Sequence, residues 1–103
     1  MVSDTSLTFR SLVIYHYTRG EARVGTCELV VKRIKELCRE RAITPNGLSY
    51  IAGMSQSTIK SILNGESLNP GIVTLKKLCD GFEITLAEFF DTKEFNELEQ
   101  ELV

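Results

Sequence analysis

The sequence predicts an all-α domain of five helices preceded by an N-terminal extension. The length of 103 residues is that of one domain, and 43% hydrophobic with 25% charged residues is ordinary usage for a globular protein. From Leu29 onward, apolar residues recur at helical spacing. Capping residues, glycines and prolines interrupt this pattern at short intervals, as they do between short helices.

Residues 1–28 differ from the rest of the chain and are expected to form the N-terminal extension. They are rich in β-forming residues, and Arg19-Gly20 offers a turn, so a strand or hairpin is predicted. Because polar and apolar residues alternate imperfectly, disorder or a strand that forms only with a partner is the alternative.

The first helix is expected over residues 29–42, where basic residues fill the positions between apolar ones. The apolar stripe, with spacings of i, i+4, i+7 and i+8, consists of Val30, Ile34, Leu37 and Cys38. This spacing places the four side chains on one face, which we expect to be buried.

The second helix is expected to begin at Pro45. The Thr44 hydroxyl can cap this helix, and proline is tolerated at the first helical position because its missing N–H would have no partner there. Leu48 and Ile51 are expected to face the core, and Gly53 to end the helix.

The third helix is expected over residues 55–64, directly after the second. Ser55 is its capping residue, and Met54 can pack on Ile59 as a hydrophobic staple. The apolar stripe consists of Ile59, Ile62 and Leu63. The outward-facing side chains are polar: Gln56, Ser57, Lys60, Ser61 and Asn64. The following glycine supplies a stop signal.

The fourth helix is expected after residues 69–71, which read Asn-Pro-Gly. Its expected core residues are Ile72, Leu75, Leu78, Cys79 and Phe82. A short fifth helix is marked by two signals at its start. Thr85 and Glu88 form a capping box, and Ile84 and Phe89 form a hydrophobic staple.

Charge is unevenly distributed, although the net charge is only −2. Residues 29–77 hold eight Lys and Arg against three Glu, a net +5, whereas residues 78–103 hold one Lys against eight acids, a net −7. This asymmetry predicts one face for a polyanion, with solvated helix faces as the alternative reading. Residues 91–103 form an acidic tail in which Phe95, Leu98 and Leu102 continue an amphipathic spacing. It is expected to be either a last helix packed on a partner or a frayed end.

Composition argues against several classes of function. The apolar runs are too short for a membrane span or a signal peptide, so a cytoplasmic protein without membrane contact is expected. Three widely spaced cysteines and one histidine predict neither a disulfide framework nor a metal site. Residues 57–60 spell an SxxK motif, but the accompanying motifs of penicillin-recognising enzymes are missing. No enzymatic activity and no cofactor are expected.

The second and third helices, joined by a tight turn over residues 52–55, form a helix-turn-helix. The turn leaves the start of the third helix projecting, so its side chains can enter a DNA major groove about 12 Å wide. The run TPNGLSYIAGMSQSTI at residues 44–59 is followed by NG at 64–65, NP at 69–70 and ITLAEF at 84–89. In this order the motifs resemble the Cro and phage-repressor helix-turn-helix family, also called the XRE family, over residues 29–90.

The resemblance implies a five-helix, phage-repressor-like domain that binds DNA. The implied base contacts are Gln56, Ser57 and Ser61. The implied phosphate contacts are Thr44, Ser55, Thr58, Lys60 and Asn64. For Gln56 the chemistry agrees, because an amide can bond adenine N6 and N7 together and discriminate by about 1–3 kcal/mol. Beside Thr44, the backbone amides and the helix dipole also favour a phosphate.

The sequence departs from the family pattern at two places. Pro45 stands where the family often has a glutamine that touches the DNA backbone. Cys38 and Leu63 occupy the places of an arginine and a glutamate that often form a buried ion pair. Because both positions are apolar, neither leaves an unpaired charge, and we expect the two side chains to be in contact.

We therefore expect a sequence-specific regulator of transcription that binds double-stranded DNA as a repressor, reading the major groove with residues 55–64. It is expected to act as a homodimer on half-sites about 34 Å apart, with the extension and the tail as dimer surfaces. The alternative is a protein-interaction module, such as an antitoxin-like partner, that uses the same fold without strong DNA binding.

Overall fold

The computed structural model describes residues 25–101, which are helical and contain no strand within that range. In chain order the helices are α2 (Thr26–Glu40), α3 (Pro45–Ala52), α4 (Gln56–Leu63), α5 (Ile72–Phe82), α6 (Leu86–Phe90) and α7 (Lys93–Asn96). The α-helical fold class is confirmed. The described residues hold six helices instead of the five expected, because the tail contributes α7.

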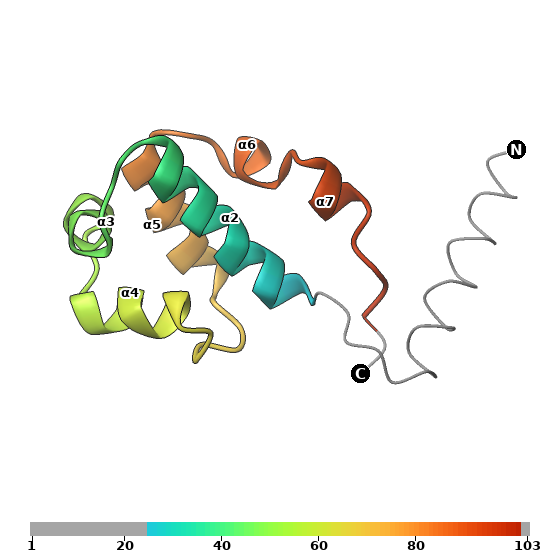
Figure 1. The fold of residues 1–103 in the computed structure, drawn as a ribbon, viewed down its shortest axis with the longest axis horizontal. Helices are drawn as coiled ribbons and strands as arrows, with labels where there is room; N and C mark the ends of the chain where they lie inside the picture. Colours follow the sequence, from blue (N-terminus) through green and yellow to red (C-terminus); the bar gives the residue numbers. More distant parts are fainter. Residues whose placement is uncertain (1–24, 102–103) are drawn as a thin grey trace, which may run out of the picture.

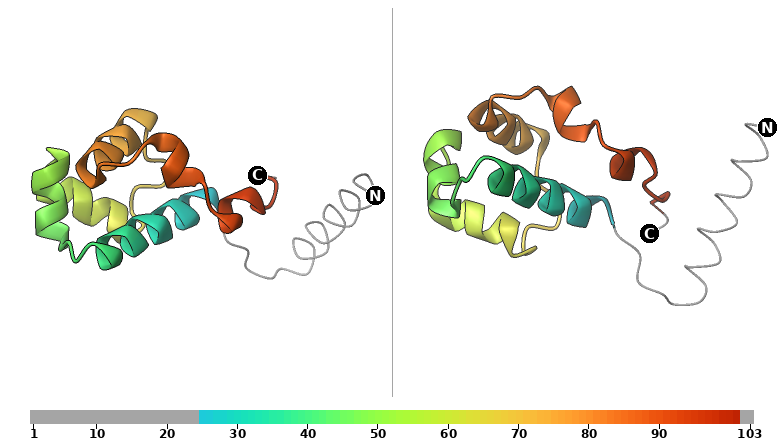
Figure 2. Two further views of the ribbon diagram at one scale, coloured as in Figure 1. Left: turned by 90° about the horizontal axis from the view of Figure 1, so that it is seen from above. Right: turned by 45° about the horizontal axis from the view of Figure 1, so that its top comes forward.

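The helices are arranged around α2, which runs along the middle of the molecule (Figure 1). The helix α3 stands across the C-terminal end of α2 and packs against both α4 and α5. Figure 2 shows α4 on one side of α2, with α6 and α7 on the other. The acidic tail is therefore held away from α4.

The helix α2 begins three residues before the expected start at Leu29. The Gly25 N–H donates a hydrogen bond to Glu28 Oε1 at 2.8 Å, which closes the first turn around Thr26. This acidic residue in the first turn was the available sequence signal. The expected strand or hairpin of the extension lies outside the described residues, apart from residues that belong to the start of α2.

The predicted capping box at the start of α6 is confirmed. The Glu88 N–H donates to the Thr85 hydroxyl at 3.0 Å, and the Thr85 N–H donates to the Glu88 carboxylate at 2.8 Å. The next helix, α7, begins in a similar way, with the Phe95 N–H donating to the Thr92 hydroxyl at 3.1 Å. Side-chain caps thus fix the ends of even these very short helices.

One hydrophobic cluster forms the core, and every helix from α2 to α6 contributes to it. Its members are Val30, Ile34, Leu37, Leu48, Ala52, Ile59, Ile62, Leu75, Leu78, Cys79, Phe82 and Phe89. Partly buried residues, among them Cys38 and Leu63, pack against this cluster. Both lie where α2 and α4 meet the core, and their contact with each other stays a prediction.

Two residues expected in the core are exposed instead. Ile51 is 41% exposed because the buried face of α3 is made by Leu48 and Ala52. Its side chain covers the edge of α5 at Gly81, where an added Cβ would lie 3.1 Å from Ile51 Cγ1. Ile72 is 63% exposed because it is the first residue of α5, one turn ahead of the first side chain that the core buries.

Two arginines of the expected positive segment bind the ends of later helices. The Arg33 guanidinium donates to the carbonyls of Phe89 at 2.8 Å and Glu88 at 3.0 Å. Arg41 donates to the Phe82 carbonyl. Each guanidinium also lies about 6 Å from the ring of its phenylalanine, at 5.9 and 6.0 Å. These arginines therefore tie the ends of α5 and α6 to the first helix of the domain.

The acidic tail packs on its own domain. The Phe95 ring meets Phe90 edge to face, with centroids 4.9 Å apart, and lies 6.1 Å from Phe89. An ion pair between Lys32 and Glu94 also joins α2 to α7. Phe95 thus packs within its own chain and is half-buried, while Leu102 lies outside the described residues. The role of the tail as a dimer surface stays a prediction.

Candidate nucleic-acid interface

The start of α3 has the predicted cap. The Thr44 hydroxyl accepts a hydrogen bond from the Gly47 N–H at 3.0 Å, and Pro45 occupies the first helical position. Both Thr44 and Asn46 are exposed at this helix terminus. An anion that approached it would meet the positive end of the helix dipole.

A glycine in the left-handed region makes the turn between α3 and α4. Gly53 has φ 65° and ψ 36°, and the Met54 N–H donates to the Ser49 carbonyl at 3.0 Å, which closes the last turn of α3. Only residues 53–55 separate the two helices, so the chain changes direction between α3 and α4 in a short turn. This is the helix-turn-helix geometry that the sequence predicted.

Three hydroxyl groups are linked at the start of α4. The Ser55 hydroxyl accepts from the Thr58 N–H at 3.2 Å. It also lies 2.8 Å from the Thr58 hydroxyl and 3.2 Å from the Ser57 hydroxyl. Because each oxygen is held by another, this polar first turn is ordered before any ligand binds.

Seven of the eight residues that the resemblance implied as DNA contacts are exposed: Thr44, Ser55, Gln56, Ser57, Thr58, Lys60 and Asn64. The eighth, Ser61, is half-buried. Its hydroxyl donates to Glu66 Oε1 at 3.2 Å. With its hydrogen used in this way, Ser61 offers its oxygen as an acceptor for a ligand.

The outer face of α4 borders a hollow of about 510 Å³ that reaches the start of α5. Its walls are rich in uncharged polar groups: Ser57, Thr58, Ser61, Ser67, Asn69 and Thr74. Ser67, Asn69 and Thr74 were not among the residues implied as DNA contacts. The polar run between Asn64 and Pro70 was the signal, but only the fold brings it beside α4.

This interface is almost uncharged. Between residues 42 and 75 only Lys60 and Glu66 carry charge, and both are exposed. Positive charge elsewhere in the expected +5 segment is partly used inside the domain, by Arg33, Arg41 and two lysine–carboxylate pairs. These pairs are Lys32 with Glu94 and Lys76 with Asp80. The net +5 of residues 29–77 therefore comes from residues 29–41 and from Lys76 and Lys77, and not from residues 42–75.

The described residues offer few groups for other chemistry. Burial raises the pKa of the Cys38 thiol and, with a further contribution from Asp80, that of Cys79, so both favour the neutral form. Within residues 25–101, no three His, Cys, Asp or Glu side chains gather as a metal-binding group. None of the helices in that range has the length and apolar character needed to cross a bilayer.

Comparisons with known proteins agree with this geometry. Residues 33–94 match the family model described as the Cro/C1-type HTH DNA-binding domain. Among solved structures, the crystal structure of the prophage Lp1 protein 11 is similar, with a TM-score of 0.65 and 32% sequence identity. That similarity covers 74% of this chain and 100% of the prophage chain. A search of curated proteins found no match.

Proposed function

Because the chain belongs to the Cro/C1-type helix-turn-helix DNA-binding family, we propose that it is a sequence-specific transcriptional repressor that inserts α4 into the major groove. Gln56, Ser57 and Ser61 would contact bases. The phosphate contacts would come from the groups around them: Thr44, Ser55, Thr58, Lys60 and Asn64. The protein would act in the cytoplasm, on duplex DNA.

The observation that carries this proposal is the polar, exposed and ordered first turn of α4. Gln56 presents an amide that matches adenine in the major groove. The linked hydroxyls of Ser55, Ser57 and Thr58 lose little conformational entropy on binding, since they are already held. Hydrogen bonds of this kind specify bases even where charge is low.

The low charge of the interface leads to an unusual expectation for the salt dependence of binding. Each phosphate neutralised by Lys or Arg adds about 0.9 to the slope of log K against log salt. One α4 helix brings only Lys60, so we expect a shallow slope and weak non-specific binding. Affinity would then depend mainly on hydrogen bonds and on the number of subunits bound.

We propose that two copies bind together, because one short helix contacts few base pairs. The two half-sites would lie about 34 Å apart, and the selected operator would be partly palindromic. Since Phe95 packs on its own domain, the tail contributes less to such a dimer than the sequence alone indicates.

The test is a selection from random DNA duplexes followed by a salt titration. A repressor of this kind enriches one partly palindromic site and binds it with a slope of about −2 for two subunits. A reporter gene behind that site should be expressed less when the protein is present. If no sequence is enriched at low salt, the proposal fails.

The nearly neutral face of α4 favours one second candidate, a protein-interaction module of the same fold. Under that proposal the exposed polar face would bind a protein partner. The same selection separates the two, because an interaction module enriches no DNA sequence.

A further inference from the structure

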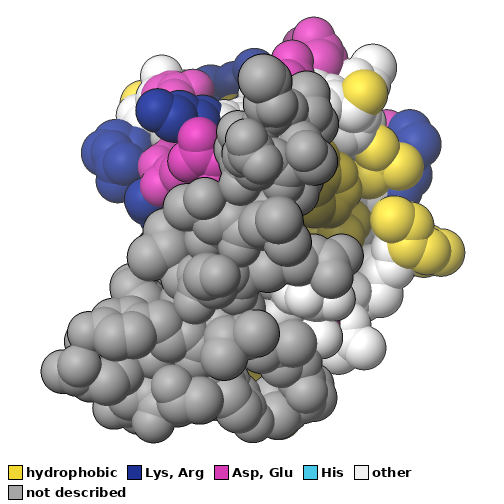
Figure 3. Space-filling view, turned by 90° about the vertical axis from the view of Figure 1, so that its right-hand side faces the viewer, with side chains coloured by type: hydrophobic (Ala, Val, Ile, Leu, Met, Phe, Trp, Pro, Cys, Tyr) yellow, Lys and Arg dark blue, Asp and Glu magenta, His cyan; other side chains and the backbone are white. Residues whose placement is uncertain are grey.

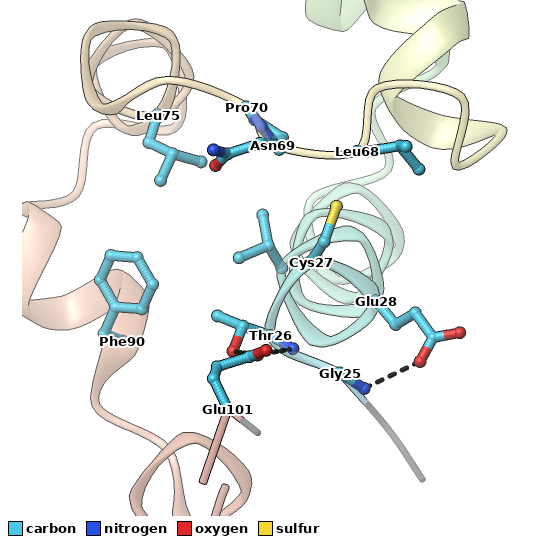
Figure 4. Close-up of a pocket in the computed structure, with 11 residues that line it drawn as sticks. Gly25, Thr26, Cys27, Glu28, Leu68, Asn69, Pro70, Leu75, Phe90 and Glu101 are labelled. Carbon is cyan, nitrogen blue, oxygen red and sulfur yellow. Dashed lines mark hydrogen bonds between the residues drawn. The ribbon is translucent and has the colours of Figure 1, made fainter. Parts of the chain in front are cut away.

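A second hollow lies on the side of the molecule where α2 begins. It has a volume of about 610 Å³ and lies between the first turn of α2, the loop between α4 and α5, the end of α6 and the tail (Figure 4). Its lining residues are Gly25, Thr26, Cys27, Glu28, Val30, Leu68, Asn69, Pro70, Leu75, Phe90 and Glu101. A space of this size holds several large side chains.

The walls of this hollow are mainly apolar. Val30 and Leu75 are core residues that also line the hollow. Leu75 and Phe90 lie on the same side of it (Figure 4). At its rim, Leu68 is 82% exposed. Figure 3 shows hydrophobic side chains at the surface on this side of the molecule. A segment that covered these apolar side chains would remove them from water.

The charged residues of the lining are both acidic. Glu28 accepts a hydrogen bond from the Gly25 N–H, and Glu101 accepts one from Thr26. Because the lining residues that the structure describes include no Lys or Arg, the hollow favours an apolar occupant that carries positive charge.

The N-terminal part of the same chain, which is joined to the hollow through Gly25, has this composition. Gly25 lines the hollow and is preceded by 24 residues of the same chain. Within them, residues 7–17 read LTFRSLVIYHY, in which Arg10 is the only Lys, Arg, Asp or Glu. Seven residues, 18–24, connect this stretch to Gly25. From residue 17 to Gly25 the chain can therefore reach up to about 26 Å at ~3.3 Å per residue step. A tether this short gives an effective concentration in the millimolar range.

We propose that residues 7–17 dock into this hollow of their own chain, with apolar side chains on Leu68 and Phe90 and Arg10 beside the acidic rim. The proposal holds whether or not α4 binds DNA. Because Asn69 and Pro70 line both this hollow and the one beside α4, the docked stretch would also brace the loop next to the interface.

The thiol of Cys27 reports directly on this docking, because it is half-buried, lines the hollow and donates to the Ser67 carbonyl at 3.2 Å. The full chain is alkylated with iodoacetamide, a small neutral reagent, and the rate at each cysteine is followed by peptide mass spectrometry. If the stretch is docked about 90% of the time, a variant that cannot dock should react at Cys27 about tenfold faster.

The variant is the double change Val13→Asp with Ile14→Asp, and Val2→Asp is its matched control outside the stretch. Faster alkylation of Cys27 in the double variant alone supports the proposal, and equal rates in all three chains overturn it. Cys79 lies in the core and should stay unreactive, which checks that each chain is folded.

A second variant changes the hollow instead of the stretch. Leu68→Asp should also speed Cys27 alkylation, whereas Tyr50→Asp, at a side chain that is 88% exposed, should not. The added carboxylate by itself would disfavour the thiolate and slow the reaction, so an increase cannot arise from local charge. A decrease, or no change, overturns the proposal. Protection that strengthens with protein concentration would assign the hollow to a second copy and overturn docking within one chain.

Discussion

Gln56 is the residue with the most specific expected role in DNA binding. Its exposed amide begins α4, where it can reach a base edge. Gln56→Ala should therefore relax the preference at one base pair by about 1–3 kcal/mol and leave the others unchanged. Lys60→Ala is the matched change on the same helix, and it should weaken binding to all sequences alike and reduce the salt slope by about one per subunit. Binding measured against a panel of single-base operator variants checks both. A uniform loss of affinity in Gln56→Ala would contradict the base contact.

Glu66 places a negative charge beside the groups that are proposed to meet DNA. Its carboxylate accepts the Ser61 hydrogen bond at 3.2 Å and is exposed. Glu66→Gln removes the charge but keeps an acceptor, so affinity for the selected site should rise by about 3- to 10-fold at low salt, with the gain fading as salt screens it. Glu97→Gln, on the acidic tail away from α4, is the control and should have no effect. A lower affinity in Glu66→Gln would mean that the carboxylate itself binds the operator.

For most of the proposed DNA contacts on α4, the sequence correctly predicted that the side chain is exposed, but it did not predict the hydrogen bonds between these side chains. The exposure of Gln56 and Lys60 follows from helical periodicity and a cap at Ser55. The bond between Ser61 and Glu66 depends on the path of the chain after α4, which no local pattern specifies. Exposure is therefore a local property, whereas a hydrogen bond across a turn is not.

The turn between α3 and α4 depends on the left-handed backbone of Gly53, which has φ 65°. A side chain at this conformation is strained, so Gly53→Ala should lower the free energy of unfolding by about 1–2 kcal/mol. Gly53→Asn should cost clearly less, because asparagine tolerates this region better than alanine does. Urea unfolding of the three proteins measures the difference. An equal cost for the two changes would show that the strain does not control this turn.

Helix positions could be predicted well because each start has its own chemical signal. Thr44, Ser55 and Thr85 cap three helices as expected. The orientation of a helix around its axis was harder to predict, and Ile51 was assigned to the core although it lies at the edge of α5. In a helix of only eight residues, two apolar side chains define the buried face poorly, and the packing partner decides it.

The distribution of charge can be understood only in the whole molecule. Residues 29–77 have a net positive charge, but this net charge comes from outside residues 42–75, and two of its carriers, Arg33 and Arg41, hold later helices. The tail, on the other side of α2, keeps its acidic residues away from α4 (Figure 2). Although the protein has a net charge of −2, the distance of the acidic tail from α4 limits its repulsion of DNA bound at α4.

Packing of the tail within one chain and its use as a dimer surface predict different effects of changing Phe95. Phe95 packs edge to face with Phe90 and is half-buried, so Phe95→Ala should lower the free energy of unfolding of the single chain by about 2 kcal/mol, less than for a fully buried ring. Because the lost contacts lie within one chain, this cost should be the same at low and high protein concentration. Glu97→Ala, at a neighbouring exposed position, should cost less than about 0.5 kcal/mol.

If the tail served instead as a dimer surface, the effect of Phe95→Ala would grow with protein concentration. The reason is that the Phe95 ring would then stabilise the wild-type chain only when two copies are associated. Urea unfolding at two concentrations about a hundredfold apart separates these outcomes.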